Sequence, residues 1–153
     1  GTLDITASDD AIHATTIFQI DDGELSLTAA EGIEATYIQI NGGTIDIYAT
    51  DDGINAGRKS NYYNVVIEFN GGYTTIVMGQ GDTDGVDSNG DLYINGGTID
   101  VTANSPFDYD GVAEYNGGTI IVNGSETNTI TNQFGGGMGG MGGWGGFGGG
   151  GRR

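Results

Sequence analysis

The chain has 153 residues, which is enough for one domain of ordinary size and too few for two. It carries 21 acidic residues against 4 basic ones, a formal net charge of -17, and it has no cysteine. The absence of cysteine excludes a disulfide scaffold and a thiolate metal site. The negative charge disfavours binding to nucleic acid and to anionic membranes, and it attracts cations. No apolar run is long enough to predict membrane insertion.

A repeated phrase divides the chain into turns of similar length. Its fullest form is Gly-Gly-Thr-Ile followed by alternating aliphatic residues. The copies begin at Gly1, Asp22, Gly42, Gly71, Gly96 and Gly117, with spacings of 21, 20, 29, 25 and 21 residues. A base turn of about 20 residues, with insertions in the third and fourth turns, is too short for a propeller blade or a helical repeat.

Three places within each turn show the pattern of a short strand, and helical periodicity is absent. The first strand has the pairs Leu25/Leu27, Ile45/Ile47, Ile99/Val101 and Ile120/Val122; the second has Ile12, Ile33, Ile54 and Val86; the third has Phe18/Ile20, Ile38/Ile40, Ile67/Phe69 and Leu92/Ile94. The pattern predicts an all-β fold, a parallel β-helix (β-solenoid) of about six turns over residues 1–133. An antiparallel sandwich would give no reason for a fixed repeat length.

One polar residue precedes each glycine pair or its equivalent. These residues are Asp21, Asn41, Asn70, Asn95 and Asn116. Stacked asparagines at one corner of a solenoid can exchange side-chain amide hydrogen bonds from turn to turn, and the following glycines allow the positive φ of a bend. We therefore expect an asparagine ladder at this corner.

Carboxylates recur just before the second strand. When the turns are aligned on that strand, Asp10, Glu31, Asp52 and Asp84 fall in one row. Neighbouring turns lie about 4.8 Å apart, and two like charges at that distance repel by roughly 3 to 4 kcal/mol at an effective dielectric constant near 20. The row therefore predicts protons or cations between the carboxylates.

The densest acidic segment covers residues 82–91. It resembles the opening of an EF-hand loop but lacks the glycine at the sixth position and the closing glutamate. Hard oxygen ligands without histidine or cysteine favour calcium over zinc or copper. The candidate ligands are Asp9, Asp10, Glu31, Glu34, Asp51, Asp52, Asp82, Asp84, Asp87, Asn89, Asp91 and Asp108. A solvated acidic edge that binds no specific ion is the alternative.

The fifth turn can be aligned in two ways. Matching Asp110-Gly111-Val112 to the repeated motif leaves too few residues for a third strand, whereas matching by length places Phe107 in the core and Asp108 beside Asp87. We prefer the alignment by length. The single histidine, His13, falls on the outward row of Glu34 and is expected to be a surface residue that pairs with acid.

Two phrases and a glycine-rich tail carry a family resemblance. The phrases Asn41-Gly42-Gly43-Thr44-Ile45-Asp46-Ile47 and Asp51-Asp52-Gly53-Ile54-Asn55-Ala56, followed by Gly136-Gly137-Met138-Gly139-Gly140-Met141, resemble bacterial carbohydrate-binding domain-containing parallel β-helix proteins of clostridial type, which are similar in fold to polysaccharide lyases. The resemblance covers residues 3–133 and the tail. It implies a right-handed, calcium-binding β-helix located outside the cell or on its surface, with affinity for cellulose or acidic sugars and no catalysis.

A loop inserted in the third turn is the candidate for carbohydrate or partner contact. A lyase would need a basic residue to remove a proton from a uronate, and the solenoid offers only Arg58 and Lys59. Both lie next to Tyr62 and Tyr63, whose rings could stack on sugars. We therefore expect a binding loop in a protein that is not an enzyme; a subunit contact is the alternative.

The tail, residues 134–153, consists of Gly-Gly-X repeats. Within residues 135–151 the residues other than glycine are Met138, Met141, Trp144 and Phe147, at a strict spacing of three. This period suits an extended polyglycine or polyproline II helix, which has three residues per turn and would place the four side chains on one stripe. We expect this stripe to pack on solenoid surface.

The two ends of the solenoid have no capping element in the sequence pattern. The chain enters its first strand at Leu3 and leaves the sixth turn after Val122 without an amphipathic helix. Open strand edges favour head-to-tail stacking, which does not close and so gives a filament. The leading hypothesis is a calcium-stabilised extracellular homopolymer whose tails bridge subunits, and the alternative is a non-catalytic module that binds polysaccharide.

Overall fold

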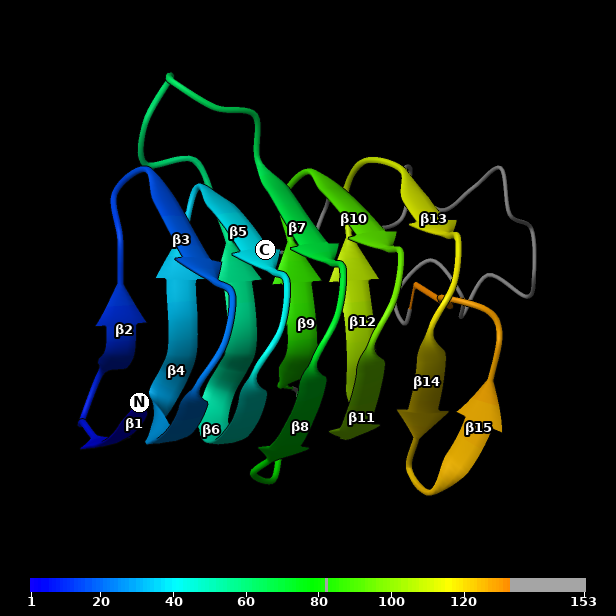
Figure 1. Ribbon diagram of the computed structural model, residues 1–153, viewed down its shortest axis with the longest axis horizontal. Coiled ribbons are helices and arrows are strands. Elements are labelled where there is room, and N and C mark those ends of the chain that lie inside the picture. Colours follow the sequence, from blue (N-terminus) through cyan, green and yellow to red (C-terminus); the bar gives the residue numbers. More distant parts are fainter. Residues whose placement is uncertain (82, 133–153) are drawn as a thin grey trace.

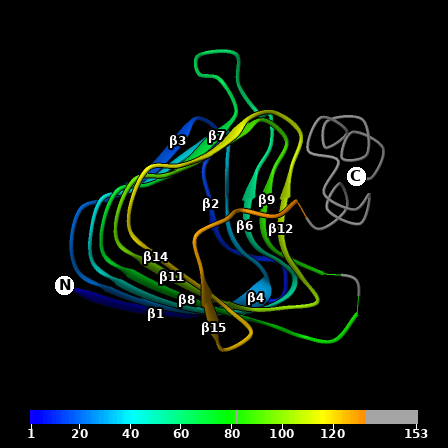
Figure 2. The same cartoon turned by 90° about the vertical axis from the view of Figure 1, so that its right-hand side faces the viewer.

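The computed structural model describes residues 1–81 and 83–132, and none of these residues is helical. The expected β-solenoid is confirmed: short parallel strands stack along the long axis (Figure 1), and the view along the stack has three sides (Figure 2). Because the described residues form strands and loops only, no helix among them could cross a membrane.

Each side of the solenoid is a ladder of strands from successive turns. The first side contains β1 (Thr2–Thr6), β4 (Glu24–Ala35), β6 (Thr44–Ala56), β8 (Tyr73–Met78), β11 (Thr98–Thr102) and β14 (Thr119–Val122), with β15 (Ser125–Thr127) at its end. The second contains β2 (Asp10–His13), the later parts of β4 and β6, β9 (Asp84–Ser88) and β12 (Ser105–Tyr109). The third contains β3 (Ile17–Ile20), β5 (Tyr37–Ile40), β7 (Val66–Phe69), β10 (Asp91–Ile94) and β13 (Ala113–Tyr115).

The register agrees with the repeat in the sequence. Thr2, Glu24, Thr44, Tyr73, Thr98 and Thr119 are aligned from β1 to β14. In the second ladder, Phe107 follows Val86 and is buried. The alignment of the fifth turn by length is therefore confirmed, and β13 supplies its short third strand.

The core is a set of apolar rows inside the three ladders. Ile33, Ile54, Val86 and Phe107 form one row, and each is at most 1% exposed. Burial of a side chain of this size contributes roughly 1.5 to 3 kcal/mol. The rows hold adjacent turns in register, since a slip by one residue would turn every apolar side chain outward.

Two strands are longer than the sequence predicts. β4 and β6 each run without a break through the first and second sides, whereas the other turns break at this corner. The register shifts by one residue there, because Ala29 pairs with Ala49 but Glu31 pairs with Asp52. A bulge of one residue bends a strand without ending it, so the two sides are joined in these turns.

The asparagine ladder is present at the corner between the third and first sides. The Nδ2 atoms of Asn41, Asn70, Asn95 and Asn116 each donate to the residue one turn before, at 2.7, 2.8, 2.8 and 2.8 Å. The second glycine of each pair has positive φ, for example 81° at Gly72. A Cβ at Gly72 would lie 2.6 Å from the carbonyl oxygen of Gly43, so glycine is required by both conformation and space.

The C-terminal end of the stack is covered. β15 turns back and pairs antiparallel with β14 through Asn123 and Gly124, whose φ values are 49° and 86°. The chain then crosses the fifth turn, where Tyr109 Oη donates to the carbonyl oxygen of Ile130 at 3.1 Å. The expectation of an open edge is wrong for β14, because an Asn-Gly turn lets the chain pair with its own last strand, whereas β13 is the outermost strand of the third side.

The N-terminal end does expose apolar side chains, among them Leu3 and Ile17.

The predicted tail lies outside the described residues, and with it the expected stripe of Met138, Met141, Trp144 and Phe147. Asp82, a predicted calcium ligand, also lies outside them.

Candidate functional site

Two rows of polar side chains run along the second ladder. The register aligns Asp10, Glu31, Asp52, Asp84 and Ser105 in the first row, and His13, Glu34, Asn55, Asp87 and Asp108 in the second. The stacking of the four predicted carboxylates is therefore confirmed, and a serine continues their row in the fifth turn. Each turn presents its two polar residues three positions apart.

Glycines between the rows fix this arrangement. Gly32, Gly53 and Gly85 each follow a carboxylate of the first row. A Cβ on Gly53 would lie 2.5 Å from the carbonyl oxygen of Gly85 and 2.6 Å from Cγ2 of Ile76. The turns approach too closely here for a side chain, so the Asp-Gly-Ile phrase reflects packing as well as charge.

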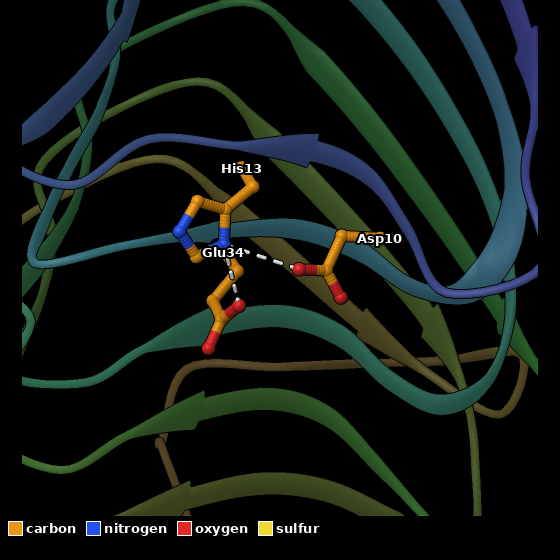
Figure 3. Close-up of side chains that lie close together, drawn as sticks. All are labelled: Asp10, His13 and Glu34. Carbon is orange, nitrogen blue, oxygen red and sulfur yellow. Dashed lines mark hydrogen bonds and ion pairs between the residues drawn. The ribbon is translucent and has the colours of Figure 1, made fainter.

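The protein supplies its own cations at the N-terminal end of the rows. His13 Nδ1 lies 2.9 Å from Glu34 Oε1 and 3.1 Å from Asp10 Oδ2 (Figure 3), and Lys59 Nζ forms an ion pair with Glu34. The prediction that His13 pairs with acid is confirmed. Lys59, a candidate for sugar contact, instead reaches back to the acidic row.

The pKa values of this group reflect the pairing. The hydrogen bond to Glu34 raises the pKa of His13, against a smaller opposing effect of burial. Burial alone would raise the pKa of Glu34, but hydrogen bonds from Lys59, Asp10 and His13 outweigh it and lower that pKa. Glu34 is therefore held as a carboxylate between two basic groups.

The middle of the rows is a second group of acids: Glu31, Asp51 and Asp52 each offer a carboxylate oxygen within 4.8 Å of the others. Burial raises the pKa of Glu31, although Asn55 Nδ2 donates to its Oε1 at 3.1 Å.

The third group joins the third and fourth turns. Carboxylate oxygens of Asp52, Asp84 and Asp87 lie within 4.8 Å of one another, and Asp87 is only 2% exposed. Burial, followed by the charges of Asp87 and Asp84, raises the pKa of Asp52 to about 8. Nearby, Asn55 Oδ1 is buried and accepts no hydrogen bond from the described residues. This set of oxygen donors fits the ligand preference of calcium.

The remaining predicted ligands are spread over other parts of the turn. Asp91 lies at the start of β10, where its Oδ1 accepts from the backbone N–H of Val112 at 2.8 Å and its Oδ2 from Tyr93 Oη at 3.2 Å. Asn89 follows β9, and Asp9 precedes β2. Asp108 is buried one turn beyond Asp87 in the second row. Asp84 and Asp87 thus belong to the rows, while Asp91 lies on the third side.

The loop between β6 and β7 stands out from the solenoid (Figure 1) and carries two exposed tyrosines. Tyr62 is 87% exposed and Tyr63 is 43% exposed. The ring of Tyr63 meets Tyr37 of β5 edge to face, with centroids 5.6 Å apart. Arg58 Nη1 donates to the carbonyl oxygen of Ser60 within the loop, at 3.2 Å.

A polar network that the sequence analysis did not single out lies beside this loop. Tyr37 Oη donates to Glu68 Oε2 at 2.8 Å, and Gln39 Nε2 donates to Glu68 Oε1 at 2.9 Å. Burial, with the adjacent Glu68, raises the pKa of Tyr37 to about 12. The repeat in the sequence does not indicate that a loop from another turn contacts this face.

Comparison with known proteins gives one match. Residues 1–85 match the model of a family described as "carbohydrate-binding domain-containing protein". The match covers the His13 group, Asp52, Asp84 and the tyrosine loop. No curated protein and no solved structure matches the chain.

Proposed function

Because the chain belongs to the family of carbohydrate-binding domain-containing proteins, we propose that it is a non-catalytic, extracellular or cell-surface module that binds polysaccharide and is stabilised by calcium. The observation that carries the proposal is the pair of exposed tyrosines, Tyr62 and Tyr63, on a loop that projects from a rigid solenoid. Large exposed aromatic side chains on a soluble surface favour a binding role over a packing role.

The surface around the loop suits a sugar. The Tyr63 ring is held by Tyr37, and Tyr37, Gln39 and Glu68 form a connected set of hydrogen-bonding groups beside it. An aromatic face with a few fixed polar groups is the usual composition of a small-molecule site. Since the strands of the third ladder position these groups, little order has to be gained on binding.

The basic residues give no support for a lyase reaction. Lys59 is in an ion pair with Glu34, and Arg58 donates to its own loop. A general base must reach the proton that it removes with a free lone pair. We therefore assign binding, and no catalytic step, to this loop.

Calcium is the proposed ion for the third acidic group. Asp52, Asp84 and Asp87 would hold it, with Asn55 Oδ1 as a neutral donor. When bound, the cation would offset the repulsion between stacked carboxylates, which is the chemistry that the rows require. At the other end of the rows Lys59, and His13 when it is protonated, would perform the same neutralisation.

Retention on insoluble polysaccharide tests the proposed function. The full chain should be retained on cellulose or on polygalacturonate, and the double variant Tyr62→Ala/Tyr63→Ala should lose most of that retention because the aromatic surface is gone. Tyr73→Ala is the matched control, since Tyr73 is exposed on the first side of the solenoid. Equal retention of the double variant and the parent, or no retention of the parent on either material, would contradict the proposal.

A filament is the second candidate function. At the N-terminal end β1 and β3 are edge strands, and Leu3 and Ile17 are exposed there. These features favour stacking of another copy at that end. In this proposal the glycine-rich tail, through Met138, Met141, Trp144 and Phe147, bridges subunits. Since β15 occupies the edge of β14, growth at the other end would need β15 to be displaced.

A further inference from the structure

A recess lies at a different corner of the solenoid from the tyrosine loop. It has a volume of about 580 Å³ and is formed in four successive turns, beside Tyr48 within β6 and where β8, β11 and β14 end. Figure 2 shows the loops after β6 and after β8 leaving different corners of the three-sided cross-section. Residues that line the recess include Tyr48, Gln80, Gly81, Thr102, Asn104 and Asn123, and we name it the Tyr48 groove.

Among the described residues, the side chains that line the Tyr48 groove are uncharged and mostly polar, although the chain as a whole has a net charge of -17. Gln80, Asn104 and Asn123 bring side-chain amides, each with donor and acceptor atoms, and Thr102 brings a hydroxyl. A cation would require carboxylates, and a phosphate would require basic groups. The lining therefore fits a neutral ligand with many hydroxyl groups.

Tyr48 gives the groove an aromatic face. Its side chain lies on the outside of β6 and is 45% exposed, next in register to the exposed Val77 of β8. The hydroxyl of Tyr48 lies close to Gly79 in the following turn, where an added Cβ would be 3.4 Å from Oη. Gly79 therefore leaves the space beside the tyrosine open.

Hydrogen bonds fix the walls of the groove. The Asn123 side chain bridges to Ala103, accepting from its N–H at 2.9 Å and donating to its carbonyl oxygen at 3.0 Å. Asn104 Nδ2 donates to the carbonyl oxygen of Gly81 at 2.9 Å. These bonds tie three turns together across the recess, so its shape exists before any ligand arrives.

We infer that the Tyr48 groove binds a segment of neutral saccharide, with a sugar ring on Tyr48 and hydroxyl groups hydrogen-bonded to Gln80 and Asn104; the inference rests on the proposed function in carbohydrate binding. A uronate chain is disfavoured at this place, because the described lining of the groove offers no basic group and the strongly negative chain repels carboxylates. The groove and the tyrosine loop are then two separate contacts, which together would increase avidity for a long polymer.

The test is calorimetric titration of the full chain with two soluble probes of equal length, cellohexaose as the neutral probe and hexagalacturonate as the acidic one. We expect cellohexaose to bind, and Tyr48→Ala to weaken that binding at least tenfold. Tyr48→Phe should keep it, since the ring remains. Tyr73→Ala is the control, because Tyr73 is also 45% exposed and lies outside the groove. Since none of the described residues that line the groove is a carboxylate, EDTA should leave the affinity for cellohexaose unchanged below the melting temperature.

Two results would overturn the inference. One is equal affinity of the parent and Tyr48→Ala for cellohexaose, with both proteins folded by circular dichroism. The other is a parent that does not bind cellohexaose but is retained on polygalacturonate through Tyr62 and Tyr63. That result would contradict the inference about the groove and leave the proposed function in place. Retention on neither polymer, by contrast, contradicts the proposed function itself.

Discussion

Asp52 is surrounded by acids on both sides along the solenoid axis. Its neighbours are Glu31 one turn before and Asp84 one turn after, and burial, followed by the charges of Asp87 and Asp84, raises its pKa from 3.8 to about 8. Without a metal, the folded protein thus binds a proton that the unfolded chain releases between these two values. The stabilisation from this proton is complete below about pH 3.8 and is lost as the pH rises through about 8.

Replacement of Asp52 should therefore change how stability depends on pH. In EDTA, we expect the melting temperature of the parent to fall by several degrees between pH 5 and pH 8.5, and Asp52→Asn to flatten this fall because asparagine is always neutral. Calcium should restore the parent at pH 8.5 and have much less effect on the variant, since one of its ligands is lost. Thermal melts followed by circular dichroism measure both effects.

The control for this prediction is Asp46→Asn, which removes one charge from the exposed face of the same strand, β6. It should leave both the pH dependence and the calcium effect of the parent in place. Parallel pH curves for the parent and Asp52→Asn would rule out the titration of Asp52, and a parent whose melting temperature is the same with calcium and with EDTA would rule out the calcium proposal.

The asparagine ladder is an element in its own right, because its hydrogen bonds run between turns and belong to no strand. Asn70 donates to Asn41 and accepts from Asn95, whereas Asn116, the last member, only donates to Asn95. Each such bond contributes about 0.5 to 1.5 kcal/mol in a typical protein. The position along the ladder should therefore set the cost of a substitution.

We expect Asn70→Ala to lower the free energy of unfolding by about 1 to 3 kcal/mol, and Asn116→Ala to lower it by about half as much. Urea denaturation of the two variants and the parent gives these values. Equal costs at the two positions would mean that the ladder acts locally at each corner and does not link the turns.

Sequence reasoning succeeded for the strands because a solenoid repeats its own register. Rows such as Ile33 and Ile54 are visible as a fixed spacing, and the same spacing stacked Asp52 on Asp84. Contacts that depend on an insertion were not predictable in this way. Lys59 reaches Glu34 from a loop that only one turn contains, so no repeat marks the pair.

The end of the stack shows a second kind of failure. An Asn-Gly turn at Asn123 and Gly124 was present in the sequence, but the strand after it, Ser125–Thr127, lacks the apolar alternation by which strands are recognised. The groove at Tyr48 was missed for a related reason: its lining comes from strand and loop residues of several turns, which no local pattern connects.

At the scale of the whole molecule, the two ends are unlike. At the first turn β1 and β3 are edge strands, whereas at the last turn β15 pairs with the edge of β14. Gly124 holds the hairpin at a φ of 86°, and a Cβ there would meet nothing within 4 Å, so a side chain would act only through backbone conformation. A substitution at Gly124 should therefore weaken the pairing of β15 with β14.

We expect Gly124→Val to increase end-to-end association, because β15 would leave the edge of β14 and expose it to another copy. Ser125→Val is the matched control, since it adds the same side chain within β15, where an extended backbone accepts valine. Sedimentation velocity and negative-stain images of both variants and the parent provide the measurement. Long filaments of the parent would show that β15 is no barrier, and a monomeric Gly124→Val would count against stacking at that end.

The antiparallel pairing of β14 with β15 also bears on how the chain folds. Val122 and Ser125 pair across a two-residue turn, whereas parallel pairs join residues such as Thr98 and Thr119, or Thr44 and Tyr73, that are a whole turn apart in sequence. Local hairpins close in about 1 to 10 microseconds, and pairings of high contact order are much slower. The β14–β15 hairpin can thus form early and offer an edge on which the fifth turn assembles. The turns before it can then add in order. Ribosomal synthesis delivers the turns in the opposite order, so the earliest turns leave the ribosome before this edge exists.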